Sequence, residues 1–407
     1  MISMKKYFFT VALGLPVLFF ITGSPAATLT VGKTAGFDYE VIQDAVDAAA
    51  DGDTITIGPG WYEEYQWVPP GEVLYVDTGL KSLTIIGSGP EETIIGHEDP
   101  PFASHVRTFG MEAQGDEFSI RDISFRNMTR LCFNFAYGNV TVDNCGFLDS
   151  GEGLYLSSLD TCVVRDCHFE NLGWGVVPYH AYTIKLGGGV TSASIENCQF
   201  IEADNAIGTW WDSYDVTVKD CNFDGCFGGV SFTDGAAGRV QRCDFQSVKH
   251  FSLAVSNSGN VVMEDCTSLS TTIPDLISVG VLVFYGPSTL SLYRNIFEMQ
   301  GPGACLAINV NDATILAEDN HFLRQGEDAW FVKRYESFSS SGEPRHYDLS
   351  GNWWGTTDLD TISTWIEDYN DDPEQLYIVD FEPILDHPVA TQKKNLGDLK
   401  SLFRGRR

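Results

Sequence analysis

The 407-residue chain has few basic residues, 25 lysines and arginines against 56 aspartates and glutamates, and its formal net charge is −31. Such a surface repels the phosphates of nucleic acids and anionic membranes, so we expect neither as a partner. It also disfavours polyanionic sugars unless bound Ca²⁺ reverses the local field. We predict no resident cofactor and no metal-ligand set, and we leave Ca²⁺ open because acid-rich loops such as Asp368 to Pro373 can hold it. The plainer interpretation of the charge is a solubilising surface.

Two other patterns are missing. The ten cysteines and eight histidines contain no CxxC motif and no spacing typical of zinc sites. After the first 27 residues no stretch approaches the length that spans a membrane, so membrane insertion is not expected. Residues 1–27 combine a basic start, an apolar run from Tyr7 to Ile21 and small residues from Ser24 to Ala27. This pattern predicts a bacterial-type secretory signal peptide and a secreted protein, extracellular or periplasmic.

What the chain does have is one phrase that keeps returning. It reads VTVDNCGF at Val140 to Phe147, ASIENCQF at Ala193 to Phe200 and VTVKDCNF at Val216 to Phe223. More divergent copies extend the series from Phe125 to Trp354. In the whole series, most copies follow the previous one by 22 or 23 residues. A fixed period of this size is the signature of a solenoid.

The phrase also indicates which solenoid it builds. Val142 and Cys145 are both apolar but three residues apart, a spacing that one alternating strand cannot place on one face. Asp143 and Asn144 are typical turn residues, so VTV and CGF become two short strands separated by a corner, and GLYLS from Gly153 a third. Stacked units of this kind form a parallel β-helix of about a dozen coils. A sandwich does not require the same residue at the same corner each time.

The cysteines fit this architecture. One cysteine per copy falls at the same place in the phrase, followed in later copies by asparagine, which can hydrogen-bond along the stack; this column is Cys145, Cys167, Cys198, Cys221, Cys243, Cys266, Asn295, Asn320 and Asn352. Side chains one coil apart sit roughly 4.8 Å from each other, too far for a disulfide, so these cysteines act as small buried apolar residues. Four cysteines lie outside the column, and one pair among them could form a bridge: Cys132, Cys162, Cys226 and Cys305.

Both ends of the repeat region carry a family likeness. The string IQDAVDAAADGDTITIGPGWYEE, the later LTIIGSGPEETII and the closing GNWWGTTDLDTISTWIEDYNDDP resemble right-handed parallel β-helix proteins of the pectate-lyase-like superfamily. The resemblance covers nearly all of residues 28–385 and implies a helix over Tyr39 to Ala50 that plugs the N-terminal end of the stack. At the other end, Thr357 or Asp358 can cap a short helix that closes the last coil. These motifs maintain coils and caps, and none of them is catalytic.

The predicted organisation is therefore all-β, a right-handed parallel β-helix with an N-terminal and a short C-terminal capping helix. Residues 1–27 form the signal peptide and residues 28–385 one domain. Within that domain, residues 28–60 form the N-terminal cap and first coil, and residues 351–385 form the C-terminal cap. Residues 386–407 form a basic tail, interpreted as a mobile segment or a docking element.

Candidate site residues lie on the outward face of the third strand, under the long insertion from Gly173 to Gly189. There aromatic rings stand beside short polar side chains, a combination that suits the apolar faces and hydroxyls of sugars. The predicted substrate-binding residues are Tyr155, Trp174, His180, Tyr182, Trp210 and Asp212. The plainer interpretation is that tryptophans such as Trp174 and Trp211 pack the insertion onto the rod.

The signal for catalysis is weaker. Lys185 is the best-placed base for a lyase, and Asp212 or Asp234 can hold its cation. Glu152 and Asp204 are candidate carboxylates for a glycosidase, which needs two of them roughly 5–9.5 Å apart. We therefore predict a secreted protein that binds an extracellular polysaccharide, with cleavage as a polysaccharide lyase or glycoside hydrolase left open. The alternative is a non-catalytic structural or adhesive protein of a surface or matrix. Oligomeric state is beyond the sequence.

Overall fold

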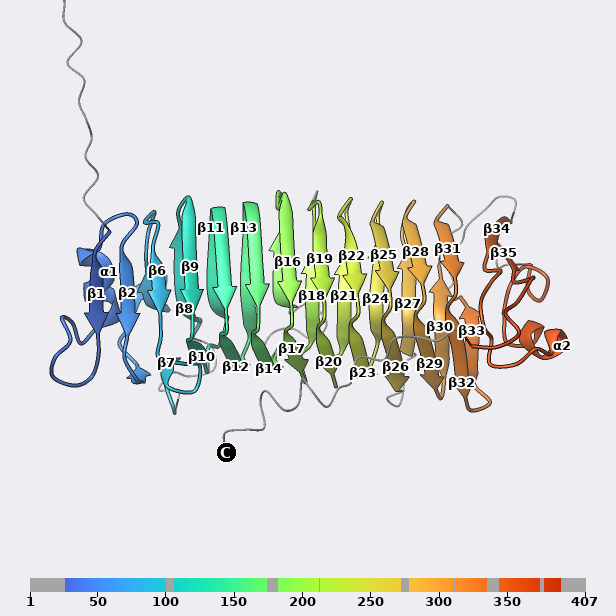
Figure 1. The fold of residues 1–407 in the computed structure, drawn as a ribbon, viewed down its shortest axis with the longest axis horizontal. Coiled ribbons are helices and arrows are strands. Elements are labelled where there is room, and N and C mark those ends of the chain that lie inside the picture. The colour runs from blue at the N-terminus through green and yellow to red at the C-terminus, as the bar shows by residue number, and fades with distance from the viewer. Residues whose placement is uncertain are drawn as a thin grey trace, which may run out of the picture.

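The chain folds into a long rod of parallel β-coils (Figure 1). The computed structural model describes residues 26–99, 106–173, 182–211, 213–271, 278–309, 312–334, 344–373 and 377–388. Residues 1–25 of the predicted signal peptide lie outside these ranges, as does the tail from residue 389 onward. The rod begins with β1 (Thr28–Val31), which pairs with β2 (Thr54–Ile57), and ends near α2 (Leu359–Ser363).

Each coil has three faces, as the phrase predicts. The first face contains β2 (Thr54–Ile57), β6 (Thr84–Ile86), β9 (Glu117–Arg121), the later parts of β11 (Leu131–Asp143) and β13 (Glu152–Arg165), then β16 (Ser192–Glu196), β19 (Val216–Lys219), β22 (Ala237–Gln241), β25 (Asn260–Glu264), β28 (Thr289–Tyr293) and β31 (Thr314–Glu318). The second face contains β3 (Gly60–Tyr62), β7 (Thr93–Gly96), β10 (Ser124–Arg126), β12 (Gly146–Ser150), β14 (His168–Leu172), β17 (Gln199–Ile201), β20 (Asn222–Asp224), β23 (Asp244–Val248), β26 (Thr267–Thr271), β29 (Ile296–Gln300) and β32 (His321–Gln325).

The third face begins with an antiparallel hairpin and continues as parallel strands. It contains β4 (Gln66–Val68), β5 (Glu72–Asp77), β8 (Thr108–Gln114), the first parts of β11 and β13, then β15 (Tyr182–Gly187), β18 (Asn205–Thr209), β21 (Gly228–Phe232), β24 (Phe251–Ser256), β27 (Ser278–Phe284), β30 (Gly303–Ile308) and β33 (Ala329–Lys333). Because β11 and β13 continue around a corner, the first and third faces form one 22-stranded sheet, while the second face has 11 strands. The stack therefore has about 11 turns, in agreement with the predicted solenoid.

The corner between the first two faces is built by the residues that the phrase places there. Asn144, Asp166, Asn197 and Asp220 have φ angles of 49°, 56°, 52° and 57°. This left-handed region is the one that aspartate and asparagine tolerate better than other residues with side chains. Successive corners also bond to each other, as in the 2.6 Å hydrogen bond from Asn144 Nδ2 to Asp122 Oδ1.

Inside the rod, identical side chains stack from coil to coil. The ring centroids of Phe125, Phe147, Phe169, Phe200, Phe223 and Phe245 are separated by 5.6, 4.8, 4.9, 4.8 and 4.5 Å in turn. The neighbouring column holds the cysteines, and all ten cysteines of the chain are buried and free. The predicted non-bonded column is confirmed. The open question of a bridge is answered too, because Cys132, Cys162, Cys226 and Cys305 form none.

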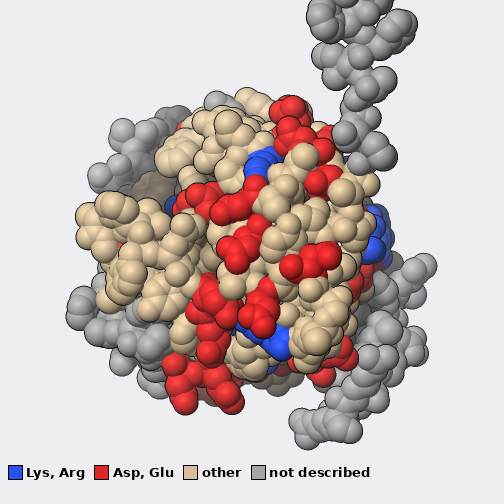
Figure 2. Space-filling view, turned by 90° about the vertical axis from the view of Figure 1, so that its left-hand side faces the viewer, with Lys and Arg blue, Asp and Glu red and all other residues tan. Residues whose placement is uncertain are grey.

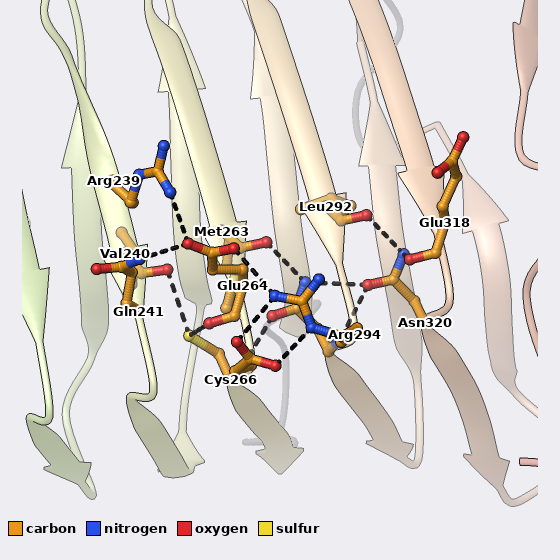
Figure 3. A network of polar contacts seen from close by, with 12 residues as sticks. Arg239, Val240, Gln241, Met263, Glu264, Cys266, Leu292, Arg294, Glu318 and Asn320 are labelled. Carbon is orange, nitrogen blue, oxygen red and sulfur yellow. Dashed lines mark hydrogen bonds and ion pairs between the residues drawn. The ribbon is translucent and has the colours of Figure 1, made fainter. Parts of the chain in front are cut away.

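Toward the C-terminal end the column changes from thiols to amides. Asn295 Nδ2 donates to Asn320 Oδ1 at 3.0 Å, and Asn320 Nδ2 donates to Asn352 Oδ1 at 3.0 Å. The predicted asparagine ladder is therefore confirmed. On the outside of the rod, just before the asparagine coils, Glu264 bridges two arginines of neighbouring coils, with 2.7 Å to Arg239 and 3.1 Å to Arg294 (Figure 3).

Short helices lie at the two ends. Near the start, α1 (Ile42–Ala48) is shorter than the predicted span and buries Ile42, Ala45 and Val46. That it plugs the stack stays a prediction. Near the other end, Asp358 rather than Thr357 caps α2, because its side chain accepts a hydrogen bond from the Thr361 amide.

A two-stranded parallel sheet of β34 (Arg345–Asp348) and β35 (Tyr377–Asp380) completes the C-terminal end. In the part of the chain that the structure describes, no helix is both long and apolar enough to cross a membrane.

Candidate functional site

The outer side of the third face, which we call the outer wall, carries the candidate site. Leu154, Leu156 and Ile207 are fully buried in the core, so strand alternation turns the residues between them outward. The strand register then aligns Tyr155 with Lys185, and Lys185 with Gly208. These orientations are the ones that the sequence predicts.

Lys185 is the centre of an aromatic arrangement in the middle of the outer wall. Its ammonium lies 5.4 Å from the ring centroid of Tyr155 and 5.0 Å from that of Trp210, both within the range of a cation–π contact. Tyr182 meets Trp210 edge to face, with centroids 4.5 Å apart. Four of the predicted residues are therefore brought together, from three consecutive coils.

A glycine makes this close packing feasible. A Cβ atom at Gly208 would lie 2.5 Å from the Tyr182 ring and 2.6 Å from the Trp210 ring. Contacts that short do not occur in proteins, so any larger residue would push the two rings apart. Burial raises the pKa of the Tyr182 phenol, and the neighbouring Ser231 hydroxyl opposes that shift. The phenol therefore stays protonated and keeps a hydrogen-bond donor at the site.

A buried carboxylate lies within electrostatic range of Lys185. Glu152 is only 7% exposed and forms an ion pair with Arg130 at 3.0 Å. Burial raises the pKa of the Glu152 carboxyl, while the charges of Arg130 and Lys185 lower it. Farther toward the N-terminal end of the outer wall, burial likewise raises the pKa of Glu112, opposed by a hydrogen bond from Asn134. Sequence reasoning missed Arg130 and Glu112; their register with the strands that carry Glu152 and Tyr155 could have revealed them.

The other predicted site residues have different positions. Trp174, His180 and Asp212 lie outside the described residues. Asp234 belongs to the turn after β21, where it has a φ of 55° and accepts hydrogen bonds from the Thr233 hydroxyl at 2.9 Å and the Asn257 amide group at 3.0 Å. These contacts give Asp234 a structural task in that turn.

Trp211, for which the plainer interpretation is packing of the insertion onto the rod, and His250 have contrasting environments. Trp211 is 59% exposed, so most of this ring faces solvent. His250 lies against the rings of Phe227 and Phe251, at 5.2 Å from each, and burial lowers its pKa to about 4. A neutral histidine held by aromatic rings is a packing residue.

No group of three or more metal-binding side chains gathers among the residues that the structure describes. In the acid-rich loop, Asp368 is 5% exposed and accepts hydrogen bonds from the amides of Asn370 at 2.8 Å and Val379 at 2.9 Å. That carboxylate therefore anchors the loop to β35. Acidic side chains nevertheless cover much of the N-terminal end of the rod, with few basic ones between them (Figure 2).

The described coils match a family model for the right-handed β-helix region over residues 102–214 and 179–322. The chain belongs to this right-handed β-helix family. The predicted right-handed parallel β-helix architecture is thereby confirmed. A search of curated proteins found no match.

Solved structures of similar shape include an alginate lyase, a tailspike protein and a pectate lyase. An alginate lyase from Paenibacillus sp. str. FPU-7 is 14% identical, with 66% of this chain and 94% of that chain covered and a TM-score of 0.47. The tailspike protein of E. coli bacteriophage HK620, in complex with a pentasaccharide, is 13% identical over 76% and 65% of the two chains, with a TM-score of 0.44. Pectate lyase Pel9A is 10% identical over 89% and 79%, with a TM-score of 0.33. Likeness this distant does not transfer an activity to this chain.

Proposed function

We propose that this β-helix protein is exported and binds an extracellular polysaccharide in the middle of its outer wall. The observation that carries the proposal is the position of the Lys185 ammonium between the rings of Tyr155 and Trp210. The alternative, a purely structural or adhesive rod, does not require such an arrangement.

The chemistry of this arrangement fits a sugar. Aromatic faces pack against the apolar faces of sugar rings, and an ammonium group donates up to three hydrogen bonds to hydroxyls or a carboxylate. Tyr155, Lys185 and Trp210 are each partly buried, so packing limits their motion while part of each stays open to a ligand. Less side-chain entropy is then lost when a ligand binds.

Cleavage is a narrower proposal. A general acid or base works best when its pKa lies near the working pH, and burial moves the pKa of Glu152 upward in that direction. Lys185 stands close enough to affect that pKa by its charge. Glu152 and Lys185 are therefore the groups whose removal should abolish any cleavage, with binding retained more fully in Glu152→Gln than in Lys185→Met.

The test is a binding screen with purified protein lacking residues 1–27. Neutral and acidic polysaccharides are cast into native gels, with and without calcium, and retardation is measured for wild type, Tyr155→Ala, Lys185→Met and Trp210→Ala. We expect each variant to lose about tenfold or more in affinity, equivalent to about 1.4 kcal/mol. Leu316→Ala is the matched control, because Leu316 is 45% exposed on β31 of the first face.

Two results would contradict the proposal. Retardation that is unchanged in all three variants would place the sugar site elsewhere on the rod. Silence across the whole panel would favour the structural or adhesive alternative. The same samples, incubated and assayed for new sugar ends, report cleavage, and a requirement for calcium would favour a lyase over a hydrolase.

A further inference from the structure

Three large aromatic side chains stand at one corner of the rod, where the third face turns into the first. They are Tyr137 within β11, Trp211 after β18 and Tyr285 after β27, and they are 62%, 59% and 46% exposed. The strand register just before this corner runs without a shift from β11 to β27. The three residues therefore occupy equivalent positions in their coils, along a line that we call the corner column.

The spacing along the corner column is regular. Two coils separate each aromatic residue from the next, namely those of β13 and β15 and then those of β21 and β24. Each interval of three coils measures roughly 14 Å, and the coils stack in a straight row (Figure 1). The positions between the rings hold short side chains or none: Ser158, Gly188, Asp234 and Asn257. The three rings therefore project from one straight edge.

The backbone of the corner column makes an aromatic residue an unfavourable choice. Tyr137, Trp211 and Tyr285 have φ angles of 72°, 45° and 55°, in the left-handed region where bulky residues are rare. Asp234 and Asn257, at the same position of two coils between them, have φ angles of 55° and 49° and tolerate that region better. Residues in such strained conformations gather at binding sites. Strain and exposed apolar surface coincide at these three rings, which points to a binding role.

Local contacts support two of the rings from one side. Trp211 lies over Gly188 of the preceding coil, where an added Cβ atom would be 3.2 Å from the Trp211 Cβ and 3.7 Å from its Cε3. The Tyr285 ring meets the Phe284 ring edge to face, with centroids 5.0 Å apart. Rings that are held while their outer surface stays open lose less side-chain entropy when they bind a ligand.

The shape and chemistry of the corner column indicate the form of its ligand. Aromatic rings pack on the apolar faces of sugars, and the net charge of −31 disfavours a polyanion. A convex edge does not enclose a single chain, and a flexible chain would lose entropy if held straight over the roughly 29 Å between the outer rings. In an ordered polymer, neighbouring chains already hold each chain straight. Three contacts to one rigid surface then reinforce each other by avidity.

We propose that Tyr137, Trp211 and Tyr285 together bind the flat surface of an ordered, uncharged polysaccharide. The choice of a polysaccharide rests on the proposed function, but the corner column is a second surface that does not include Lys185. The outer wall takes single chains and the corner column takes packed chains.

The test measures depletion of the protein, without residues 1–27, from solution by microcrystalline cellulose and by chitin powder, two insoluble uncharged polysaccharides. Wild type should bind at least one of them. The variant Tyr137→Ser/Trp211→Asn/Tyr285→Asn carries residues that neighbouring coils have at the same position, so we expect it to fold and to bind about a hundredfold more weakly. The control Trp67→Ser/Leu316→Ser removes two large side chains, 59% and 45% exposed, away from the corner column and should bind as wild type does.

Equal binding of wild type and the triple variant would overturn the proposal. An equal loss in the control variant would do the same, as would wild type that binds neither powder. Lys185→Met separates this proposal from the proposed function: it should keep its binding to the powder and lose its retardation in polysaccharide gels, while the triple variant does the reverse. Loss of powder binding in Lys185→Met would place both forms of the sugar at one site and overturn the second surface.

Discussion

Two regions of the outer wall share one architecture and differ in chemistry. Around β13, β15 and β18 the wall presents Tyr155, Lys185 and Trp210, whereas around β24, β27 and β30 it presents alanine, valine and leucine. The inner sides of the same strands are alike, with leucine, isoleucine and valine in both regions. Stacking fixes the inward residues because each must match its neighbours in the coils before and after. The outward residues are free of that constraint, and there the two regions differ.

The largest expected effect comes from charging the inward side. Cys198 is 1% exposed and lies in the cysteine column between Cys167 and Cys221 of the neighbouring coils. The variant Cys198→Asp would bury an unpaired carboxylate, at a cost above about 4 kcal/mol. We expect loss of soluble, folded protein, measured by expression yield and far-UV circular dichroism. Thr191→Asp, at an exposed turn of the same coil, is the control, and equal loss in both would contradict the distinction between the two sides.

The next prediction concerns the pH dependence of stability that the buried His250 should create. Its pKa is lowered to about 4 by burial, so the folded state disfavours the protonated ring. The stabilising contribution of the neutral ring is present above pH 6.5 and is lost as the pH falls toward 4, up to about 3 kcal/mol. Lowering the pH from 7.5 to 4.5 should therefore reduce the free energy of unfolding of wild type more than that of His250→Phe. Urea titrations at the two pH values measure this difference. A constant difference between the two proteins at both pH values would refute this.

The next prediction concerns Gly208, which lies beside the aromatic rings near Lys185. Because a side chain there would collide with both Tyr182 and Trp210, Gly208→Val should displace the rings and weaken polysaccharide binding by about tenfold, or about 1.4 kcal/mol. Near-UV circular dichroism should change, while the melting temperature moves little. Wild-type binding by this variant would mean that the ring positions do not determine recognition.

The smallest effect is expected on the first face, at the ion pairs of Glu264 with Arg239 and Arg294 (Figure 3). Arg239 and Arg294 are about half exposed and bond to Glu264. Burial raises the pKa of the Glu264 carboxyl, but hydrogen bonds from Gln241, Arg239 and Arg294 outweigh it and lower the pKa overall. The stabilisation exists above the ordinary carboxyl pKa and is lost as the pH falls below it. Glu264→Gln should cost less than about 1 kcal/mol at pH 7, with the difference shrinking toward pH 3 in thermal melts. A loss of stability as large as that expected for Cys198→Asp would show that outward ion pairs contribute as much to the stability of the fold as the buried core does.

The sequence predicts the inward side of the rod far better than the outward side. The period, the corner residues such as Asn144 and the cysteine column follow from the demand that each coil repeat the one before. Arg130 and Glu112 were missed because their relation to Lys185 depends on register across insertions of different length. The apolar outward residues of β24, β27 and β30 were missed for a related reason: Ala254, Leu282 and Ala307 alternate with core residues, and apolar residues on both sides of a strand hide which side faces out.

The most direct test concerns sugar binding by the middle of the outer wall. Hydroxyl-radical footprinting of the wild-type protein, with and without a polysaccharide that retards it in gels, tests this at individual side chains. We expect Tyr155 and Trp210 to become protected, while Trp67, 59% exposed on the hairpin at the N-terminal end, keeps its reactivity. Protection of Trp67 with no change at Tyr155 and Trp210 would contradict it.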